Sequence, residues 1–310
     1  MGVLKARHYV GTGDLEKMRN LLIEGRRANN GTYYVHIGDL NWWLFYPPID
    51  QNLWHYITVW DDPDNRERLL GWTLLSPEWN TFDVPVQPEL RGSPLAESMY
   101  HQAEEQITRL TRTQKGGKIR MMWVSQEDDI LRDHLLGGGF ERAPVADVYM
   151  TRTLEGTIPE SPLSEGVIVR PVAGTAEVMA RAAAQYAAFE SKIPFERYVQ
   201  RFLEFMRSPV YDHELDIVAA SPDGRIGSFC IVWTDPGNHV GLFEPVGTHP
   251  AFRGRGLGKA VMLEGLRQLQ AQGMQTAIVC TTENNLPAVK LYESVGFTMV
   301  DKHLTFERLI

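Results

Sequence analysis

The chain contains the stretch Arg253-Gly254-Arg255-Gly256-Leu257-Gly258-Lys259, which follows an apolar strand pattern and precedes a helical pattern. Glycine lacks a Cβ atom, so a glycine-rich backbone can take tight conformations and come close to a phosphate. The free N–H groups at the start of a helix and the helix dipole both favour an anion there. Three basic side chains add positive charge. The stretch therefore predicts a cradle for a pyrophosphate.

Other glycine-rich loops also bind phosphates, and the pattern alone is a weak signal. A P-loop has Ser or Thr after its lysine, whereas Ala260 follows Lys259 here. A dinucleotide-binding loop opens the first strand–helix–strand unit of a parallel sheet. This stretch instead follows a hairpin-rich region late in its half of the chain. A glycine-rich turn without a ligand is the plain structural alternative.

A second motif lies closer to the C-terminus and reads Glu283-Asn284-Asn285-Leu286-Pro287-Ala288-Val289-Lys290-Leu291-Tyr292-Glu293-Ser294-Val295-Gly296-Phe297. The combined order is strand, Arg-x-x-Gly-x-Gly, helix, strand, and Asn-x-x-Ala-x-x-x-Tyr-x-x-x-Gly-Phe. This order resembles the acetyl-CoA core of the GNAT (Gcn5-related N-acetyltransferase) superfamily. The close resemblance covers Leu242–Phe297. It implies an N-acetyltransferase with acetyl-CoA as its cofactor.

The resemblance also implies roles for the matching positions in cofactor binding. The backbone of Val246, Gly247 and Thr248 is expected to hold the pantetheine arm as if it were an added strand. The N–H of Val246 is expected to polarise the thioester carbonyl. Asn285 is expected to bind the cofactor arm, although it could instead cap the helix that begins at Leu286, or do both. The pyrophosphate is expected at Arg253, Gly254, Arg255, Gly256, Leu257, Gly258 and Lys259.

Tyr292 is the acid that the resemblance implies for the leaving thiolate. A phenol with a reference pKa of about 10 stays protonated near neutral pH and can donate a proton to sulfur. The helix face that carries Tyr292 also carries apolar residues such as Val295. A core tyrosine is therefore the structural alternative.

Glu244 is the candidate base that takes a proton from the amine. It precedes Val246 by two positions on a strand, so the two side chains are expected on the same face. An exposed strand carboxylate without a catalytic role is the alternative. Glu283, His239 and His249 are weaker candidates for the base.

Cys280 lies in an apolar strand, and no base is evident that would activate it for covalent acyl transfer. A packed thiol, and direct transfer in a ternary complex, are therefore expected. The histidines show no metal-ligand spacing, so no metal is expected.

The chain carries an internal repeat. Val86–Leu95 matches Thr248–Leu257 without a gap and shares the skeleton Pro-x-x-Arg-Gly-x-x-Leu. Leu135–Phe140 matches Tyr292–Phe297 in the same order. Similar strand–helix surroundings favour a duplication over chance. The first copy is expected to be a scaffold or a wall of the substrate site, because it lacks the loop glycines and the phenol: Pro94 replaces Gly256, Ala96 replaces Gly258, Asp128 replaces Asn285 and Leu135 replaces Tyr292.

The predicted fold is α+β, with a mixed sheet in each of two tandem GNAT-like domains. The expected division is a degenerate N-terminal domain (1–154), a linker rich in turn formers (155–165) and a catalytic C-terminal domain (166–310). In the first half we expect a β-rich stretch at Trp42–Tyr46, a hairpin of Trp54–Trp60 with Leu69–Leu75, and a long helix at Leu95–Arg112.

The composition limits the class of protein. The chain has 310 residues, 43% hydrophobic and 23% charged, with a formal net charge of −8. This charge argues against nonspecific binding to nucleic acid or to an anionic membrane. The two cysteines argue against a disulfide framework, and the N-terminus lacks the apolar core of an export signal. A cytoplasmic protein is expected.

The expected activity is transfer of an acetyl group from acetyl-CoA to a primary amine of a small molecule. The tandem layout is similar to that of the mycothiol synthase family, which implies a cysteinyl amine as one possible acceptor. An aminoglycoside, a polyamine or a peptide N-terminus also fits the pattern. A non-catalytic acetyl-CoA sensor is the rival from a different class. The sequence leaves the acceptor and the oligomeric state open.

Overall fold

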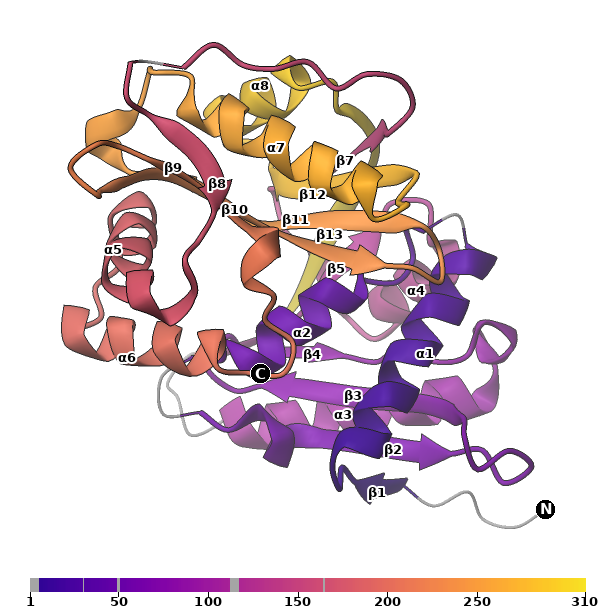
Figure 1. Cartoon of the computed structure of the whole chain (residues 1–310). Helices are drawn as coiled ribbons and strands as arrows, with labels where there is room; N and C mark the ends of the chain where they lie inside the picture. Colours follow the sequence, from indigo (N-terminus) through magenta and orange to yellow (C-terminus); the bar gives the residue numbers. More distant parts are fainter. Residues whose placement is uncertain (1–5, 30, 49–50, 112–116, 164) are drawn as a thin grey trace.

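The computed structural model describes residues 6–29, 31–48, 51–111, 117–163 and 165–310. Residues 1–5, on which the expectation about export partly rests, lie outside the described residues, as does Arg112 at the end of the expected long helix. One mixed sheet of 13 strands runs through both halves of the protein (Figure 1). Its strand order is β1-β2-β3-β4-β5-β13-β7-β12-β11-β10-β9-β8, and β6 pairs with β13. The α+β fold with a mixed sheet is confirmed.

The N-terminal half supplies the first seven strands and helices on both faces of its part of the sheet. Its elements are β1 (Ala6–His8), α1 (Thr12–Ala28), α2 (Ile37–Phe45), β2 (Ile57–Asp61), β3 (Leu69–Ser76), β4 (Thr81–Asp83), α3 (Pro94–Thr111), β5 (Lys118–Ser125), α4 (Asp129–Gly137), β6 (Glu141–Arg142) and β7 (Asp147–Thr153).

The C-terminal half repeats the order of two helices, antiparallel strands, a long helix, a strand and a short helix. Its elements are β8 (Ile168–Pro171), α5 (Val178–Ala188), α6 (Phe195–Met206), β9 (Asp216–Ala220), β10 (Ile226–Asp235), β11 (Val240–Thr248), α7 (Leu257–Ala271), β12 (Thr276–Thr282), α8 (Leu286–Ser294) and β13 (Thr298–Leu309).

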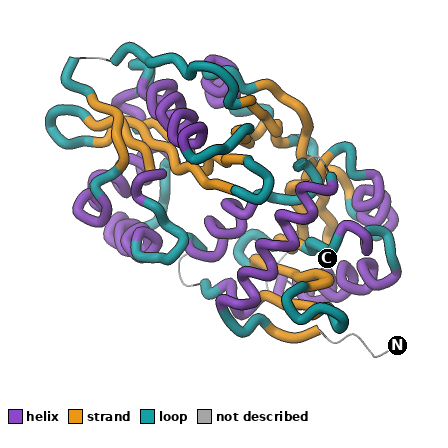
Figure 2. Tube along the Cα trace, turned by 45° about the vertical axis from the view of Figure 1, so that its right-hand side comes forward, coloured by secondary structure: helices purple, strands orange, loops and turns teal. Residues whose placement is uncertain are grey.

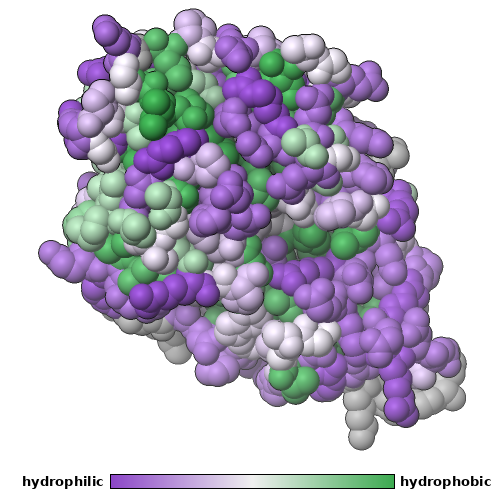
Figure 3. Space-filling view, viewed as in Figure 1, coloured by the Kyte–Doolittle hydropathy of each residue, from purple (hydrophilic) through white to green (hydrophobic). Residues whose placement is uncertain are grey.

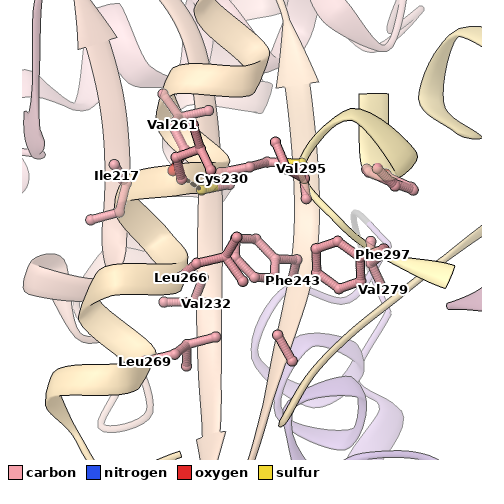
Figure 4. Close-up of a cluster of buried hydrophobic side chains, with 14 of the residues drawn as sticks. Ile217, Cys230, Val232, Phe243, Val261, Leu266, Leu269, Val279, Val295 and Phe297 are labelled. Carbon is pink, nitrogen blue, oxygen red and sulfur yellow. Dashed lines mark hydrogen bonds between the residues drawn. The ribbon is translucent and has the colours of Figure 1, made fainter. Parts of the chain in front are cut away.

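The core under α7 fixes the position of this helix, and with it the position of the glycine-rich loop. Val261, Leu266 and Leu269 of α7 are fully buried and pack on β10 and β11, as Figure 4 shows. Phe243 of β11 meets Phe297 edge-on, with ring centroids 5.9 Å apart. Burial of each such side chain contributes about 1.5–3 kcal/mol. The start of α7 is therefore anchored against the sheet.

The expectation of a β-rich stretch at Trp42–Tyr46 is wrong, because these residues end helix α2. A capping box starts the helix: the ring of His36 accepts from the N–H of Gly38, and Asp39 accepts from the N–H of His36. Leu40 and Leu44 then lie one turn apart and are both buried. Trp42 packs on Phe205 of the other half, so α2 lies between the two halves.

Each half gives its last strand to the sheet of the other half. Strand β7 of the first half pairs antiparallel with β12, and β13 at the C-terminal end pairs antiparallel with β5. The same two strands also pair with each other in the middle of the sheet. The division of the chain into two domains at residues 154 and 166 stays a proposal. It does not divide the sheet, because strands from both halves pair with each other. Figure 2 shows strands in both halves of the molecule, and the pairings above join them into one sheet.

The surface seen in Figure 3 is largely hydrophilic, with small apolar groups over the C-terminal half. Among the described residues, none of the helices is both long enough and apolar enough to span a bilayer.

Candidate active site

The glycine-rich loop leads into α7 with its backbone exposed. Gly254 and Gly256 both have φ of 75°, a left-handed conformation that favours glycine. A Cβ atom at either position would meet nothing within 4 Å, so both face open space. The first N–H bonded within the helix is that of Ala260, which donates to Gly256 O. The amides of Leu257, Gly258 and Lys259 precede it and are free to bind an anion. This geometry fits the pyrophosphate of acetyl-CoA.

Strands β11 and β12 run parallel and then separate. They pair at Val240–Thr276, Gly241–Ala277 and Leu242–Ile278, and the pairing ends there. The rest of β11, from Phe243 to Thr248, keeps its pairing with β10 only. The separated strands leave one edge of β11 free for an extended ligand.

The hydrogen-bond alternation of β10 and β11 decides which amides face this opening. The N–H of His249 donates to Gly227 O, so Ser228 and Thr248 form a non-hydrogen-bonded pair. By alternation, Cys230 and Val246 form another such pair. The N–H groups of Val246 and Thr248 therefore point away from β10, toward the side where β12 has separated.

Glu244 and Val246 lie on opposite faces of the sheet, so the expectation that they share a face is wrong. β11 has a bulge between Phe243 and Val246, with one residue more than the facing segment of β10. Val246 therefore packs toward the core under α7, together with Phe243. Glu244 points with Leu242 to the other face, where α2 lies.

Glu244 lines a cavity of about 90 Å³ at the point where β11 and β12 separate. We call it the central cavity. The C-terminal half contributes Leu242, Glu244, Ile278, Cys280, Thr281 and His303 to its wall. The N-terminal half contributes Arg26, Tyr34, Val35, His36, Asp39, Trp43, Trp123, Asp147 and Tyr149.

Removal from bulk water shifts the titration of the acids in the central cavity. It raises the pKa of Glu244 to about 8, with a further contribution from the negative charge of Asp39. Burial raises the pKa of Asp39 to about 6 and also raises the pKa of Asp147. A carboxylate with a pKa near the working pH can accept a proton and release it again, as a general base must.

Tyr292 is buried in the core under α7, on α8. Burial raises the pKa of its phenol, and the negative charge of Glu244 raises it further. The phenol therefore stays protonated. Tyr292 and Glu244 lie near the same separation of β11 and β12, on opposite faces of the sheet.

The other candidates have structural partners. Asn285 caps α8, since its side chain accepts from the N–H of Ala288, and its amide group donates to Thr281 Oγ1 at 3.1 Å. His249 accepts from the N–H of Ala251. Glu283 pairs with Lys302 at 2.8 Å. Burial raises the pKa of the Cys280 thiol well above its usual value, which disfavours the reactive thiolate.

The residues of the first half in the central cavity were not found from the sequence. Asp39 and Asp147 belong to no motif, and only the fold brings them to Glu244. Arg26 links two of these segments, because it donates to Tyr34 O at 2.8 Å and to the hydroxyl of Tyr149 at 3.1 Å. Within the described ranges, no group of His, Cys, Asp and Glu side chains could hold a metal ion.

Comparison with known proteins gives the family. A profile described as the Acetyltransferase (GNAT) family matches residues 180–297. The mycothiol acetyltransferase of Pseudarthrobacter chlorophenolicus is 27% identical over 256 residues, which cover 79% of this chain and 76% of that protein. Residues 180–297 therefore form a domain of the GNAT family. This GNAT protein is an acyltransferase that uses acetyl-CoA.

Solved structures extend the resemblance of this GNAT protein to the tandem fold. A tandem GNAT protein from the clavulanic acid biosynthesis pathway has a TM-score of 0.71 at 15% identity and covers 99% of this chain and 98% of that chain. A GCN5-related N-acetyltransferase from Sphaerobacter thermophilus has a TM-score of 0.66 at 18% identity and covers 99% of this chain and 95% of that chain. The tandem GNAT fold is thereby confirmed.

Proposed function

We propose that this GNAT acetyltransferase transfers an acetyl group directly from acetyl-CoA to a primary amine of a small molecule. The observation that carries the proposal is Glu244, a carboxyl with a pKa of about 8 at the wall of a cavity beside the separated strands. An amine enters as an ammonium ion and must lose a proton before it can act as a nucleophile. Glu244 takes that proton in the proposed mechanism.

The acyl group is supplied by acetyl-CoA as a thioester, and the remaining steps fall to residues of this chain. The amides at the start of α7 bind the pyrophosphate. The N–H of Val246 donates to the carbonyl oxygen, where negative charge develops. Tyr292 holds a proton for the departing sulfur. Cys280 stays a protonated thiol, which favours direct transfer over an acyl-cysteine.

The wall of the central cavity supports a polar, cationic acceptor. Asp39, Asp147 and Glu244 attract an ammonium group when they are ionised. Arg26 lines this wall, and its buried Nε has no hydrogen-bond partner in the described part of the chain, so it can bind a polar substituent. A volume of about 90 Å³ suits the reacting end of a small molecule. Because relatives are named mycothiol acetyltransferases, a cysteinyl amine is the first acceptor to test.

The test has two parts. Calorimetric titration with acetyl-CoA gives the number of binding sites, and release of free thiol is then measured against a panel of amines. The panel holds a cysteinyl amine, an aminoglycoside, a polyamine and a peptide with a free N-terminus. Thiol release with a small amine supports the proposal. Binding without turnover on every amine would favour a sensor, and turnover on the peptide alone would point to a protein substrate.

The free thiols Cys230 and Cys280 fit the cytoplasmic location that we also propose.

The pH profile of kcat/KM is expected to rise with pH, with an apparent pKa near 8. Glu244 works as a base only when ionised, so activity is lost as the pH falls below this pKa. The charge of Asp39 contributes to the raised pKa, so Asp39→Asn is expected to move the rising limb to lower pH. Titration of the amine itself does not respond to this substitution. A limb that stays in place in Asp39→Asn would assign it to the substrate.

Tyr292→Phe is expected to lower kcat about a hundredfold, the typical worth of a proton donor in the transition state. Phenylalanine keeps the ring beside Phe297, so the melting temperature and the affinity for acetyl-CoA are expected to change little. Single-turnover kinetics would measure the effect on the transfer step. An unchanged kcat in a folded variant would make Tyr292 a core residue only.

A further inference from the structure

The first half retains the outline of a cofactor site, and its own side chains fill it. By the internal repeat, Val86 corresponds to Thr248, Arg91 to Arg253 and Asp128 to Asn285. Val86 and Arg91 line a second cavity of about 50 Å³, and Asp128 pairs with Arg91 beside it. Such a volume holds a few water molecules and leaves no room for a pantetheine arm. We call this place the filled site.

Tyr34 is the main occupant of the filled site. Its hydroxyl donates to Val86 O at 2.8 Å, on the segment that corresponds to the cofactor-binding edge of β11. The ring lies so close to α1 that a Cβ atom at Gly25 would be 2.6 Å from it. Tyr34 is 5% exposed, and the hydroxyl bond satisfies its polar atom. The side chain of Tyr34 is thus held by Gly25 of α1 on one side and by the carbonyl of Val86 on the other.

Arg91 closes the filled site from its outer side. It forms a buried ion pair with Asp128, and its guanidinium lies over the rings of Tyr33 and Tyr34, 5.1 and 5.6 Å from their centroids. In the second half the corresponding residues, Arg253 and Asn285, are exposed. The two arginines therefore occupy the same position of the repeat, one turned inward to aromatic rings and one open to solvent.

The segment that fills this site continues directly into the wall of the central cavity. Tyr34 lines both cavities, and His36 and Asp39 line the central one. The carbonyl of Tyr34 accepts from Arg26, and His36 Nε2 lies 3.3 Å from Val240 O on β11. A shift of Tyr34 would therefore be transmitted to Arg26 in the first half and, through His36, to strand β11.

We propose that Tyr34, fixed in the filled site by Val86 and Arg91, is a positioning residue that sets the acceptor wall at His36 and Asp39. The role of that wall rests on the proposed function. Because the filled site has no room for a cofactor, the protein binds one acetyl-CoA per chain. In the first half, side chains occupy the place of a cofactor, and this half supports the cavity wall that faces the acceptor amine.

The first test needs no acceptor. Hydrogen–deuterium exchange is measured for peptides that cover residues 35–45 in the wild type, Tyr34→Phe and Tyr100→Phe. Loss of one hydrogen bond is expected to speed local exchange about fivefold in Tyr34→Phe. Tyr100 is also buried at the filled site but is no part of the central cavity, so Tyr100→Phe is the matched control. No change in Tyr34→Phe, or an equal change in both variants, would overturn the positioning role.

Calorimetry and kinetics complete the test. One acetyl-CoA per chain is expected in the wild type and in Tyr34→Phe. Two binding sites in the wild type would overturn the inference that the filled site excludes a cofactor. With an amine that the panel identifies, Tyr34→Phe is expected to raise the KM for the amine about fivefold, with kcat and the KM for acetyl-CoA changed less than twofold. An unchanged amine KM would overturn the inference. If no amine reacts with the wild type, the proposed function fails, while the exchange and stoichiometry results still decide the inference.

Discussion

Glu244→Gln is expected to lower kcat/KM for the amine about a thousandfold, within the range of general acid–base catalysis. Glutamine keeps the size and the polarity of the side chain but cannot take a proton from the ammonium group. The carboxyl lines the central cavity and lies apart from the glycine-rich loop. The affinity for acetyl-CoA, measured by calorimetry, is therefore expected to stay within twofold of the wild-type value.

Glu283→Gln is the matched control for this substitution. Glu283 is another glutamate of the C-terminal half, directly after β12, and it pairs with Lys302 and accepts from the N–H of Ala146, outside the central cavity. Its substitution is expected to leave kcat/KM within twofold. Activity of Glu244→Gln close to the wild-type level would remove Glu244 from the mechanism, as would the same loss in both variants.

The two sequence motifs were sufficient to predict the GNAT family, and they place a candidate cofactor site at the starts of two helices. Residues that follow each other in the chain carry this information, because the start of a helix positions its own first amides. The glycine-rich loop and Asn285 therefore lie where the pattern places them, at the starts of α7 and α8. The roles of these residues remain predictions.

Features that depend on distant pairing were beyond the sequence. The bulge at Pro245 reverses the face of Glu244 relative to Val246, and a period of two does not reveal it. The exchange of β7 and β13 pairs strands from different halves, and the sequence of a single strand does not reveal its partner. The composition of Trp42–Tyr46 favours a strand, because tryptophan and phenylalanine are common in strands, whereas the capping residues His36 and Asp39 start a helix.

The wall of the central cavity depends on the same kind of distant pairing. Asp39 and Asp147 come from a half that lacks the catalytic motifs, and each looks like an ordinary surface acid in the sequence. The insertion of β7 beside β12 brings Asp147 to the cavity, and α2 brings Asp39. The degenerate half thus lines the cavity where we propose that the amine binds, and its role as a substrate-site wall stays a prediction.

Gly258→Trp is expected to weaken acetyl-CoA binding at least a hundredfold, measured by calorimetry. Gly258 is buried in the first turn of α7, where a Cβ atom would lie 3.2 Å from Thr248 Oγ1 and 3.2 Å from the side chain of Leu291. An indole has no space beneath the turn, so it must displace the turn or cover it. Either result removes the free amides from the position where a pyrophosphate would bind.

Gly273→Ala separates this local effect from a general loss of stability. Gly273 follows the other end of α7, has φ of 79° and faces open space, so alanine there costs about 1–2 kcal/mol of backbone strain without touching the loop. Its affinity for acetyl-CoA is expected to equal that of the wild type, while its melting temperature falls. If Gly258→Trp folds and binds acetyl-CoA as tightly as Gly273→Ala, the pyrophosphate does not lie at the start of α7, and the cofactor site must be sought elsewhere along the free edge of β11.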